Sequence, residues 1–138
     1  MSAFRFFQDI TVRYGDLDPQ GHVNNARYLT YLEQARIGYI QALGLWDGHS
    51  FFSIGFILAT AEITYKAPIL LGQKVRVGVR VSRLGNKSMT MVYAIQDGET
   101  GDELASAETV LVAYDYRTSA TIPLPDRWRE AIRRFEGL

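Results

Sequence analysis

The sequence predicts an α+β domain in which one long helix packs against a five-stranded antiparallel sheet, followed by a short C-terminal helix. Apolar residues recur at three- and four-residue steps between positions 25 and 43, as they do on one face of a helix. Four strand-like stretches come after it, separated by residues that favour turns. With 138 residues, of which 47% are hydrophobic, the chain is expected to form a single domain over residues 1–138 around one core.

The first two elements are predicted from opposite kinds of periodicity. Polar and apolar residues alternate strictly over Asp9–Tyr14, which is typical of a strand with one buried face. The long helix is predicted over Asn25–Leu43, with Asn24 or Asn25 as its N-cap and Gly44 as its stop. The segment between these elements is expected to be a tight loop.

The remaining strands are predicted after an irregular segment at Leu45–Ser53. They cover Phe56–Lys66, Lys74–Arg83, Ser88–Gln96 and Leu104–Asp115. Asp126 is expected to cap the final short helix. A helix this apolar favours a sheet that curls around it, and an open sheet leaves edges that a second copy can pair with. We therefore expect a homodimer, or a homotetramer built as a dimer of dimers.

Composition excludes several classes of protein. Lys and Arg together number 15, as do Asp and Glu, so the positive field of a dedicated nucleic-acid-binding protein is missing. The absence of cysteine excludes disulfides, thiolate nucleophiles and cysteine-ligated zinc. The N-terminus lacks the pattern of a secretory signal, and no apolar run is long enough to span a bilayer. We expect a cytoplasmic protein with no cofactor, no metal and no membrane span.

The densest cluster of reactive side chains lies in the loop before the long helix. It consists of Asp16, Asp18, His22, Asn24 and Asn25. The first turn of a helix has unpaired N–H groups and a partial positive charge, so it can polarise a carbonyl group and stabilise an oxyanion. A carboxylate on the preceding loop can attack that carbonyl or activate water against it. The cluster therefore predicts a hydrolytic site.

The run RYGDLDPQGHVNNARYLTYLEQAR, from Arg13 to Arg36, resembles the 4-hydroxybenzoyl-CoA thioesterase-like branch of the hotdog superfamily. Its HVNN, followed by Tyr28 and Glu33, is also similar to the long-chain acyl thioesterases. The resemblance implies a hotdog fold, with the sheet wrapped around the long helix, and hydrolysis of a thioester. It places the catalytic carboxylate on Asp18, the second aspartate of D-x-D, and the N–H that polarises the thioester carbonyl on Asn25.

Three loop residues have alternative interpretations. Asp18 is the predicted general base or nucleophile, and the alternative is that its side chain only caps the turn. Asp16 is expected to support the loop rather than to react. His22 is a catalytic candidate that would orient the substrate, with a structural hydrogen bond as the alternative.

Six further residues are candidates for substrate binding: Asn24, Tyr28, Thr60, Glu62, Lys87 and Ser88. Tyr28 could line a tunnel for the acyl group or simply pack in the core. Glu62, with Thr60 on the same strand face, could reach the active site of a partner subunit or could point outward. Lys87 and Ser88 follow a turn and are the best candidates to meet the phosphates of coenzyme A (CoA).

The function that these residues favour is that of an acyl-CoA thioesterase, which releases a free carboxylic acid and CoA. One alternative is hydrolysis of an acyl carrier protein thioester, which requires the same chemistry beside a protein surface. The other is a non-catalytic module that binds acyl-CoA, because a fold alone does not establish activity.

Overall fold

The computed structural model describes residues 3–50 and 53–138. The elements in chain order are β1 (Phe6–Ile10), the 3-10 turn η1 (Tyr14–Asp16), α1 (Asn25–Ala42), β2 (Phe56–Tyr65), β3 (Val75–Leu84), β4 (Ser88–Asp97), β5 (Glu103–Asp115), β6 (Ala120–Thr121) and α2 (Asp126–Glu136).

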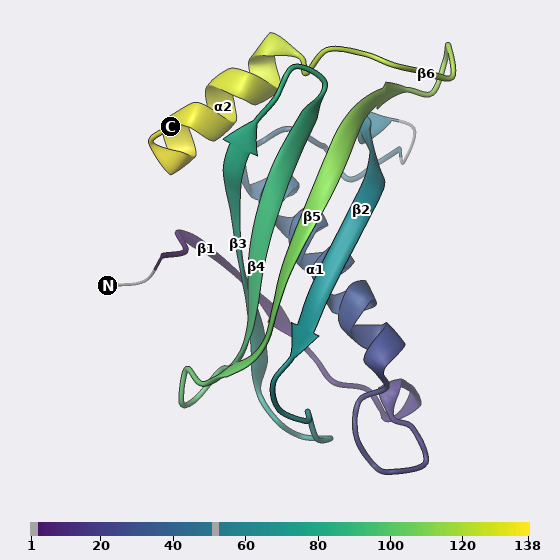
Figure 1. Ribbon diagram of the computed structural model, residues 1–138, viewed down its shortest axis with the longest axis vertical. Coiled ribbons are helices and arrows are strands. Elements are labelled where there is room, and N and C mark those ends of the chain that lie inside the picture. Colours follow the sequence, from purple (N-terminus) through teal and green to yellow (C-terminus); the bar gives the residue numbers. More distant parts are fainter. Residues whose placement is uncertain (1–2, 51–52) are drawn as a thin grey trace.

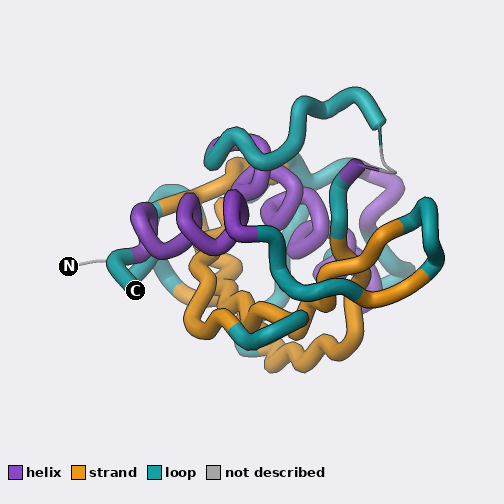
Figure 2. Tube along the Cα trace, turned by 90° about the horizontal axis from the view of Figure 1, so that it is seen from above, coloured by secondary structure: helices purple, strands orange, loops and turns teal. Residues whose placement is uncertain are grey.

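The strands form one antiparallel sheet in the order β1-β3-β4-β5-β2, and the two-residue β6 adds to β5. Helix α1 lies behind the sheet and α2 packs near the β3–β4 hairpin (Figure 1). The view from above shows the curved strands on one side and both helices on the other (Figure 2). The predicted fold class is therefore confirmed, with β6 as a short addition that the sequence did not indicate.

The core lies between α1 and the concave face of the sheet. Alternate residues of β3 from its start to Val81 are buried valines, namely Val75, Val77, Val79 and Val81. The facing stripe of α1 contains Tyr28, Leu32 and Ile40, which are also buried. A strand places every second residue on one face, and a helix places residues three and four apart on one face, so each element presents an apolar surface to the other. Within residues 3–50 and 53–138, neither helix is long and apolar enough to cross a membrane.

The predicted first strand was misplaced. The strand covers Phe6–Ile10 rather than Asp9–Tyr14, because Ile10 pairs with Val75 and β3 begins at that residue. Beyond this point the chain has no neighbouring strand, so it turns. Val12 is still buried, as the alternation predicted, but Tyr14 is 83% exposed in η1.

The ends of the helices differ in how well they were predicted. Helix α1 begins at Asn25, as expected, and ends one residue early at Ala42. The expected cap of α2 was wrong: Asp126 is the first helical residue, and Pro125 occupies the cap position without a side-chain hydrogen bond. In the first turn the negative charge of Asp126 still interacts favourably with the helix dipole and stabilises the helix. Of the segment predicted as irregular, residues 51–52 lie outside the described residues and the rest contains no long element.

Candidate active site

The loop before α1 is a narrow hairpin. Leu17 and Val23 form an antiparallel bridge, and the N–H of Asp18 donates to the carbonyl of His22 at 2.9 Å. The turn closes where the N–H of Gly21, with φ of 80°, donates to the carbonyl of Asp18 at 2.9 Å. Because directly opposed residues have neighbouring Cβ atoms, this pairing places the side chains of Asp18 and His22 beside each other.

Asp16 holds both ends of this hairpin together. Its carboxylate is 1% exposed and accepts hydrogen bonds from the N–H of Arg13 (3.0 Å), the guanidinium of Arg13 (3.1 Å) and the hydroxyl of Tyr31 (2.8 Å). Its backbone carbonyl accepts from the N–H of Asn24 at 2.8 Å. Burial alone would raise the pKa of Asp16, but these donors outweigh it and hold the pKa below 3.8. Asp16 therefore supports the loop as a carboxylate.

Asp18 has a different environment. The residue is half-buried, and its Oδ1 accepts a hydrogen bond from the N–H of Gln20 at 2.9 Å. In the described part of the chain, Oδ2 has no hydrogen-bond partner. Asp18 thus caps its own turn with one oxygen, which is the structural alternative, while the second oxygen stays available for chemistry.

The start of α1 offers the backbone N–H of Asn25 as a donor. Asn24 is the N-cap, and its Oδ1 accepts from the N–H of Ala26 at 2.9 Å. The next donor, the N–H of Arg27, is bound by the carbonyl of Asn24 at 2.9 Å. The N–H of Asn25 meets no acceptor among residues 3–50 and 53–138. This N–H, at the positive end of the helix dipole, can polarise a carbonyl oxygen.

The segment between β2 and β3 forms a wall beside the hairpin. His22 bridges to Leu70, and the N–H of Val23 donates to the carbonyl of Ile69 at 2.9 Å. Leu70 and its neighbour Leu71 are each about half exposed. No sequence pattern indicated this contact, because it joins residues that are far apart in the chain.

Tyr28 is anchored in the core next to this wall. It is 3% exposed, its hydroxyl donates to the carbonyl of Ala67 at 3.3 Å, and its ring packs edge-on against Tyr65. The hydroxyl of Tyr65 in turn donates to the carbonyl of Asn25 at 2.9 Å. Tyr28 and Tyr65 thus fix the start of α1 against the end of β2. Tyr28 therefore packs in the core of one chain, and its contact with an acyl group stays a prediction.

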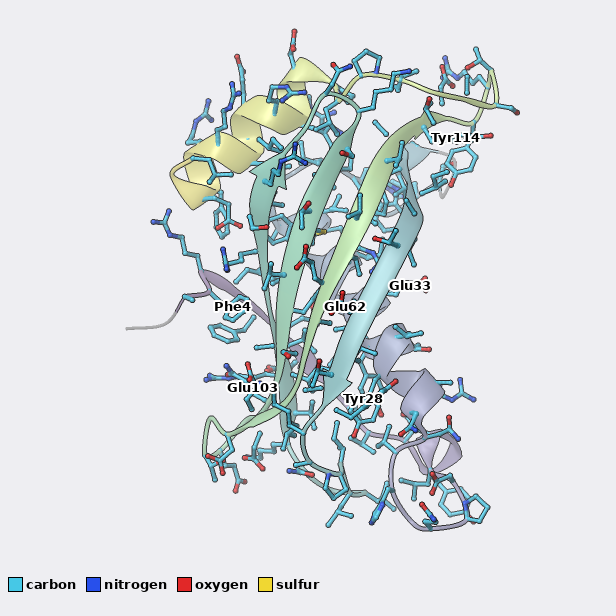
Figure 3. All side chains as sticks on the ribbon, in the orientation of Figure 1. Phe4, Tyr28, Glu33, Glu62, Glu103 and Tyr114 are labelled. Carbon is cyan, nitrogen blue, oxygen red and sulfur yellow. The ribbon has the colours of Figure 1, made fainter. Side chains whose placement is uncertain are left out.

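The other predicted substrate-binding residues lie away from the hairpin. Thr60 and Glu62 are exposed, and Glu62 stands opposite Glu108 on the face of the sheet that α1 does not cover (Figure 3). Lys87 and Ser88 lie at the β3–β4 hairpin, at the opposite end of the sheet from the loop (Figure 1). One chain therefore does not bring these residues together with Asp18.

One buried charged residue was not among the predicted site residues. Arg36 occupies a position on the apolar stripe of α1 and is only 5% exposed. One guanidinium nitrogen donates to the hydroxyl of Tyr93 at 3.3 Å. A charged residue at a core-facing position of a helix was the available signal, since arginine is rarely buried without a partner.

Comparison with known proteins identifies the family. Residues 12–132 match the family model described as the thioesterase-like superfamily. The chain belongs to this superfamily. It is a thioesterase with the hotdog fold, as the resemblance implied.

Similar proteins cover nearly the whole thioesterase. The long-chain acyl-CoA thioesterase FadM of Escherichia coli is 29% identical over 126 residues, which are 91% of this chain and 96% of FadM. A 1,4-dihydroxy-2-naphthoyl-CoA hydrolase of Synechococcus elongatus is 28% identical over 86% of this chain and 88% of its own. A Thermus thermophilus thioesterase, solved with coenzyme A and Zn, has a TM-score of 0.87 and 39% identity, covering 100% of this chain and 98% of that one.

Proposed function

We propose that this thioesterase hydrolyses an acyl-CoA thioester to a free carboxylic acid and CoA. Asp18 acts as the general base or the nucleophile, and the N–H of Asn25 polarises the thioester carbonyl. The observation that carries the proposal is that the hairpin and the helix start that follows it offer a carboxylate oxygen and a backbone N–H that have no hydrogen-bond partner among the described residues. The relatives from E. coli and S. elongatus, whose names specify CoA thioesters, support CoA as the leaving group.

The rigidity of the hairpin matters for the chemistry. The N–H of Asn25 can stabilise the developing negative charge of the carbonyl oxygen best if it is already oriented. The cap by Asn24 and the bond from Tyr65 to the Asn25 carbonyl provide that orientation. His22, beside Asp18, would orient the substrate or the attacking water. Water or the Asp18 carboxylate then adds to the carbonyl carbon, and the thiol of CoA leaves.

We further infer that the enzyme works as a homodimer joined along β2. This ten-residue strand lies at the edge of the sheet, and most of its residues are exposed, including Leu58 at 47%. The opposite edge, β1, has only five residues. A long exposed edge with apolar side chains favours pairing with a second copy, and a two-fold axis makes that pairing antiparallel.

Such a dimer would explain where CoA binds. Antiparallel pairing of two β2 strands places the Phe56 end of one copy beside the Tyr65 end of the other. The β3–β4 hairpin of the second copy then lies on the same side as the Asp18 loop of the first. Lys87 and Ser88 would therefore meet the CoA phosphates from across the interface, although they are remote from Asp18 within one chain.

The decisive experiment compares Asp18→Asn with the wild type on a panel of aliphatic and aromatic acyl-CoAs, by measuring thiol release. We expect kcat to fall by about 100- to 10,000-fold, the range for loss of a general base, while binding of CoA is kept. Asp102→Asn, at an exposed turn on another part of the sheet, is the matched control and should stay active. Equal activity of wild type and Asp18→Asn would overturn the proposal.

A single-turnover reaction in labelled water separates the two roles of Asp18. If its carboxylate attacks the thioester, an anhydride forms, and attack of water on the aspartyl carbonyl of that anhydride puts the label into the Asp18 side chain. If Asp18 activates water, the label appears only in the released acid. Label found by mass spectrometry in the peptide that contains Asp18 therefore identifies Asp18 as the nucleophile.

A further inference from the structure

A trough runs between α1 and the edge strand β2. It consists of two adjoining hollows of about 150 and 380 Å³ that share Glu33, Arg36 and Leu58. Figure 3 shows Glu33 beside β2, on the side of the sheet where α1 lies. We call this space the α1–β2 trough. It begins at Leu29, in the second turn of α1, and therefore near the N–H of Asn25.

The walls of the α1–β2 trough are mainly apolar. Besides the shared residues, the apolar lining is Leu29, Leu32 and Ala61 in the smaller hollow and Ile37, Ile54, Phe56 and Ile57 in the larger one. Thr30 and Thr109 add hydroxyl groups to the smaller hollow, and Tyr116 lines the larger one. An apolar hollow with a few placed polar groups is the usual form of a small-molecule site. The position of the trough beside the helix start makes the acyl group of the substrate its natural occupant.

Arg36 is a cation in this wall that has fewer acceptors than its guanidinium has donors. A guanidinium has five N–H donors, and the side chain is only 6% exposed. Nη1 donates to Tyr93, whereas Nη2 lies 3.8 Å from the largely exposed carboxylate of Glu33. In the described part of the chain, the buried Nε has no acceptor. A buried charge with so few partners destabilises the fold unless another group supplies the missing hydrogen bonds.

Tyr93 does not neutralise this charge. Its hydroxyl lies 2.6 Å from Oγ1 of Thr109, and burial raises its pKa above 10.0, so it stays protonated. Tyr93 and Thr109 therefore orient the guanidinium without balancing it. A carboxylate oxygen from a ligand would balance it, and a hydroxyl oxygen would accept from one of its unused N–H groups.

We propose that Arg36 binds an oxygen carried on the acyl group, remote from the thioester. This inference rests on the proposed function and names its substrate class: acyl thioesters with a carboxylate or hydroxyl along or at the end of the chain, rather than plain alkyl chains. Arg36 lies about 16 Å beyond Asn25 along the helix axis, at 1.5 Å per residue, and its side chain leans back toward the helix start. Chain length should therefore decide whether the oxygen reaches it.

The experiment measures kcat/KM for acyl-CoAs of matched chain length that end in a methyl, a hydroxyl or a carboxyl group. At the best length we expect the wild type to prefer an oxygenated end by roughly 10- to 100-fold, as for a hydrogen bond to a charged group. The hydroxyl and carboxyl series show whether the oxygen is neutral or anionic. A wild type without any such preference would overturn the inference.

Variants connect the preference to Arg36. In Arg36→Met, which removes the charge and keeps a long flexible side chain, the ratio between oxygenated and plain substrates should fall to near one. Arg36→Lys should retain part of it. The matched control is Arg80→Met, since Arg80 on β3 also has a buried Nε without an acceptor among the described residues but lies outside the trough. A preference that survives Arg36→Met would contradict the inference.

Two controls distinguish failure of the Arg36 contact from failure of the proposed function. If no acyl-CoA is hydrolysed, the proposed function itself fails; if plain acyl-CoAs are hydrolysed in an Asp18-dependent way, only the role of Arg36 is in question. If Arg36→Met changes the oligomeric state but leaves the substrate ratio intact, a second copy completes the guanidinium, and the inference is wrong. Thermal unfolding of each variant shows that it is folded.

Discussion

Asp16 and Asp18 stand two positions apart, yet their surroundings give them different properties. Asp16 is buried and receives hydrogen bonds from Arg13 and Tyr31 that involve both oxygens. Asp18 uses one oxygen in its own turn, and the other has no partner within residues 3–50 and 53–138. A fully bonded carboxylate is a poor nucleophile but a strong structural anchor, whereas a half-bonded one is both oriented and reactive.

Asp16→Asn should destabilise the fold by about 2 kcal/mol at neutral pH, because hydrogen bonds to a charged acceptor are lost in a buried site. The folded-state pKa of Asp16 is lowered, so its stabilising contribution is present above the unfolded value near 3.8 and is lost as the pH falls through the folded value. The difference between wild type and variant should therefore shrink below about pH 4. Denaturant unfolding at a series of pH values measures it.

The exposed Asp102→Asn serves as the control for this measurement, since it removes a carboxylate without buried partners. A stability difference for Asp16→Asn that stays constant into strong acid would contradict an ionised anchor at this position.

At the level of residues, the two aspartates rested on different arguments. Asp16 was expected to support the loop, and its contacts agree with that role. The reactive role of Asp18 came from the resemblance of the D-x-D pair and stays a prediction. For Arg36 the sequence shows a charged residue at a core-facing position of α1, but it does not show the partner. The partner depends on the packing of α1 against Tyr93, a residue 57 positions away.

At the scale of elements, the N-cap of α1 links the stability of the helix to the proposed catalytic site. Asn24 caps the helix with its side chain and also holds the loop through its backbone N–H, which donates to the carbonyl of Asp16. One residue thus fixes both the carboxylate hairpin and the helix start. Any change in its side chain should alter stability and turnover together.

Asn24→Ala should lower the free energy of unfolding by about 1 kcal/mol, the usual cost of losing an N-cap, because the N–H of Ala26 loses its acceptor. Since the cap also orients the N–H of Asn25, we expect kcat to fall as well. Asn24→Ser, which can still cap, should restore both quantities. A rise in KM without a change in stability would instead indicate that Asn24 contacts the substrate directly.

Elements were predicted well where one periodicity persisted and poorly where the tertiary partner set the end. The eighteen residues of α1 carry a continuous apolar stripe between a cap and Gly44, so both of its ends were placed within a residue. The first strand was shifted because its ladder depends on where β3 begins, at Val75. The two residues of β6 are too few to show any alternation.

At the scale of the whole molecule, β2 is the long exposed edge of the sheet, and the proposed dimer forms along it. The register of β2 against β5 shifts between Leu58 and Thr60, so Ala59 forms a bulge at the edge. The sequence suggested that an open sheet would pair with a second copy. It could not say through which strand, because the order β1-β3-β4-β5-β2 is a property of the folded sheet.

Ala59→Lys tests the assembly, because a two-fold contact would bring two added charges together at a bulge on the edge strand. We expect the variant to shift from dimer toward monomer in sedimentation or light-scattering measurements. Asp102→Lys adds the same side chain at an exposed turn away from this edge and should remain dimeric. A variant at position 59 that dimerises as tightly as the wild type would place the interface elsewhere.

Activity should follow assembly, since each site of the proposed dimer would combine its own Asp18 hairpin with Lys87 and Ser88 from the second copy. On dilution, the wild-type specific activity should fall when the dimer dissociates, and that of Ala59→Lys should fall at higher protein concentrations. The loss should appear mainly as a higher KM for acyl-CoA, because the hairpin is intact in each chain while the phosphate contacts are lost. If monomers hydrolyse acyl-CoA with an unchanged KM, the coenzyme binds within one chain, and Lys87 and Ser88 have no part in holding it.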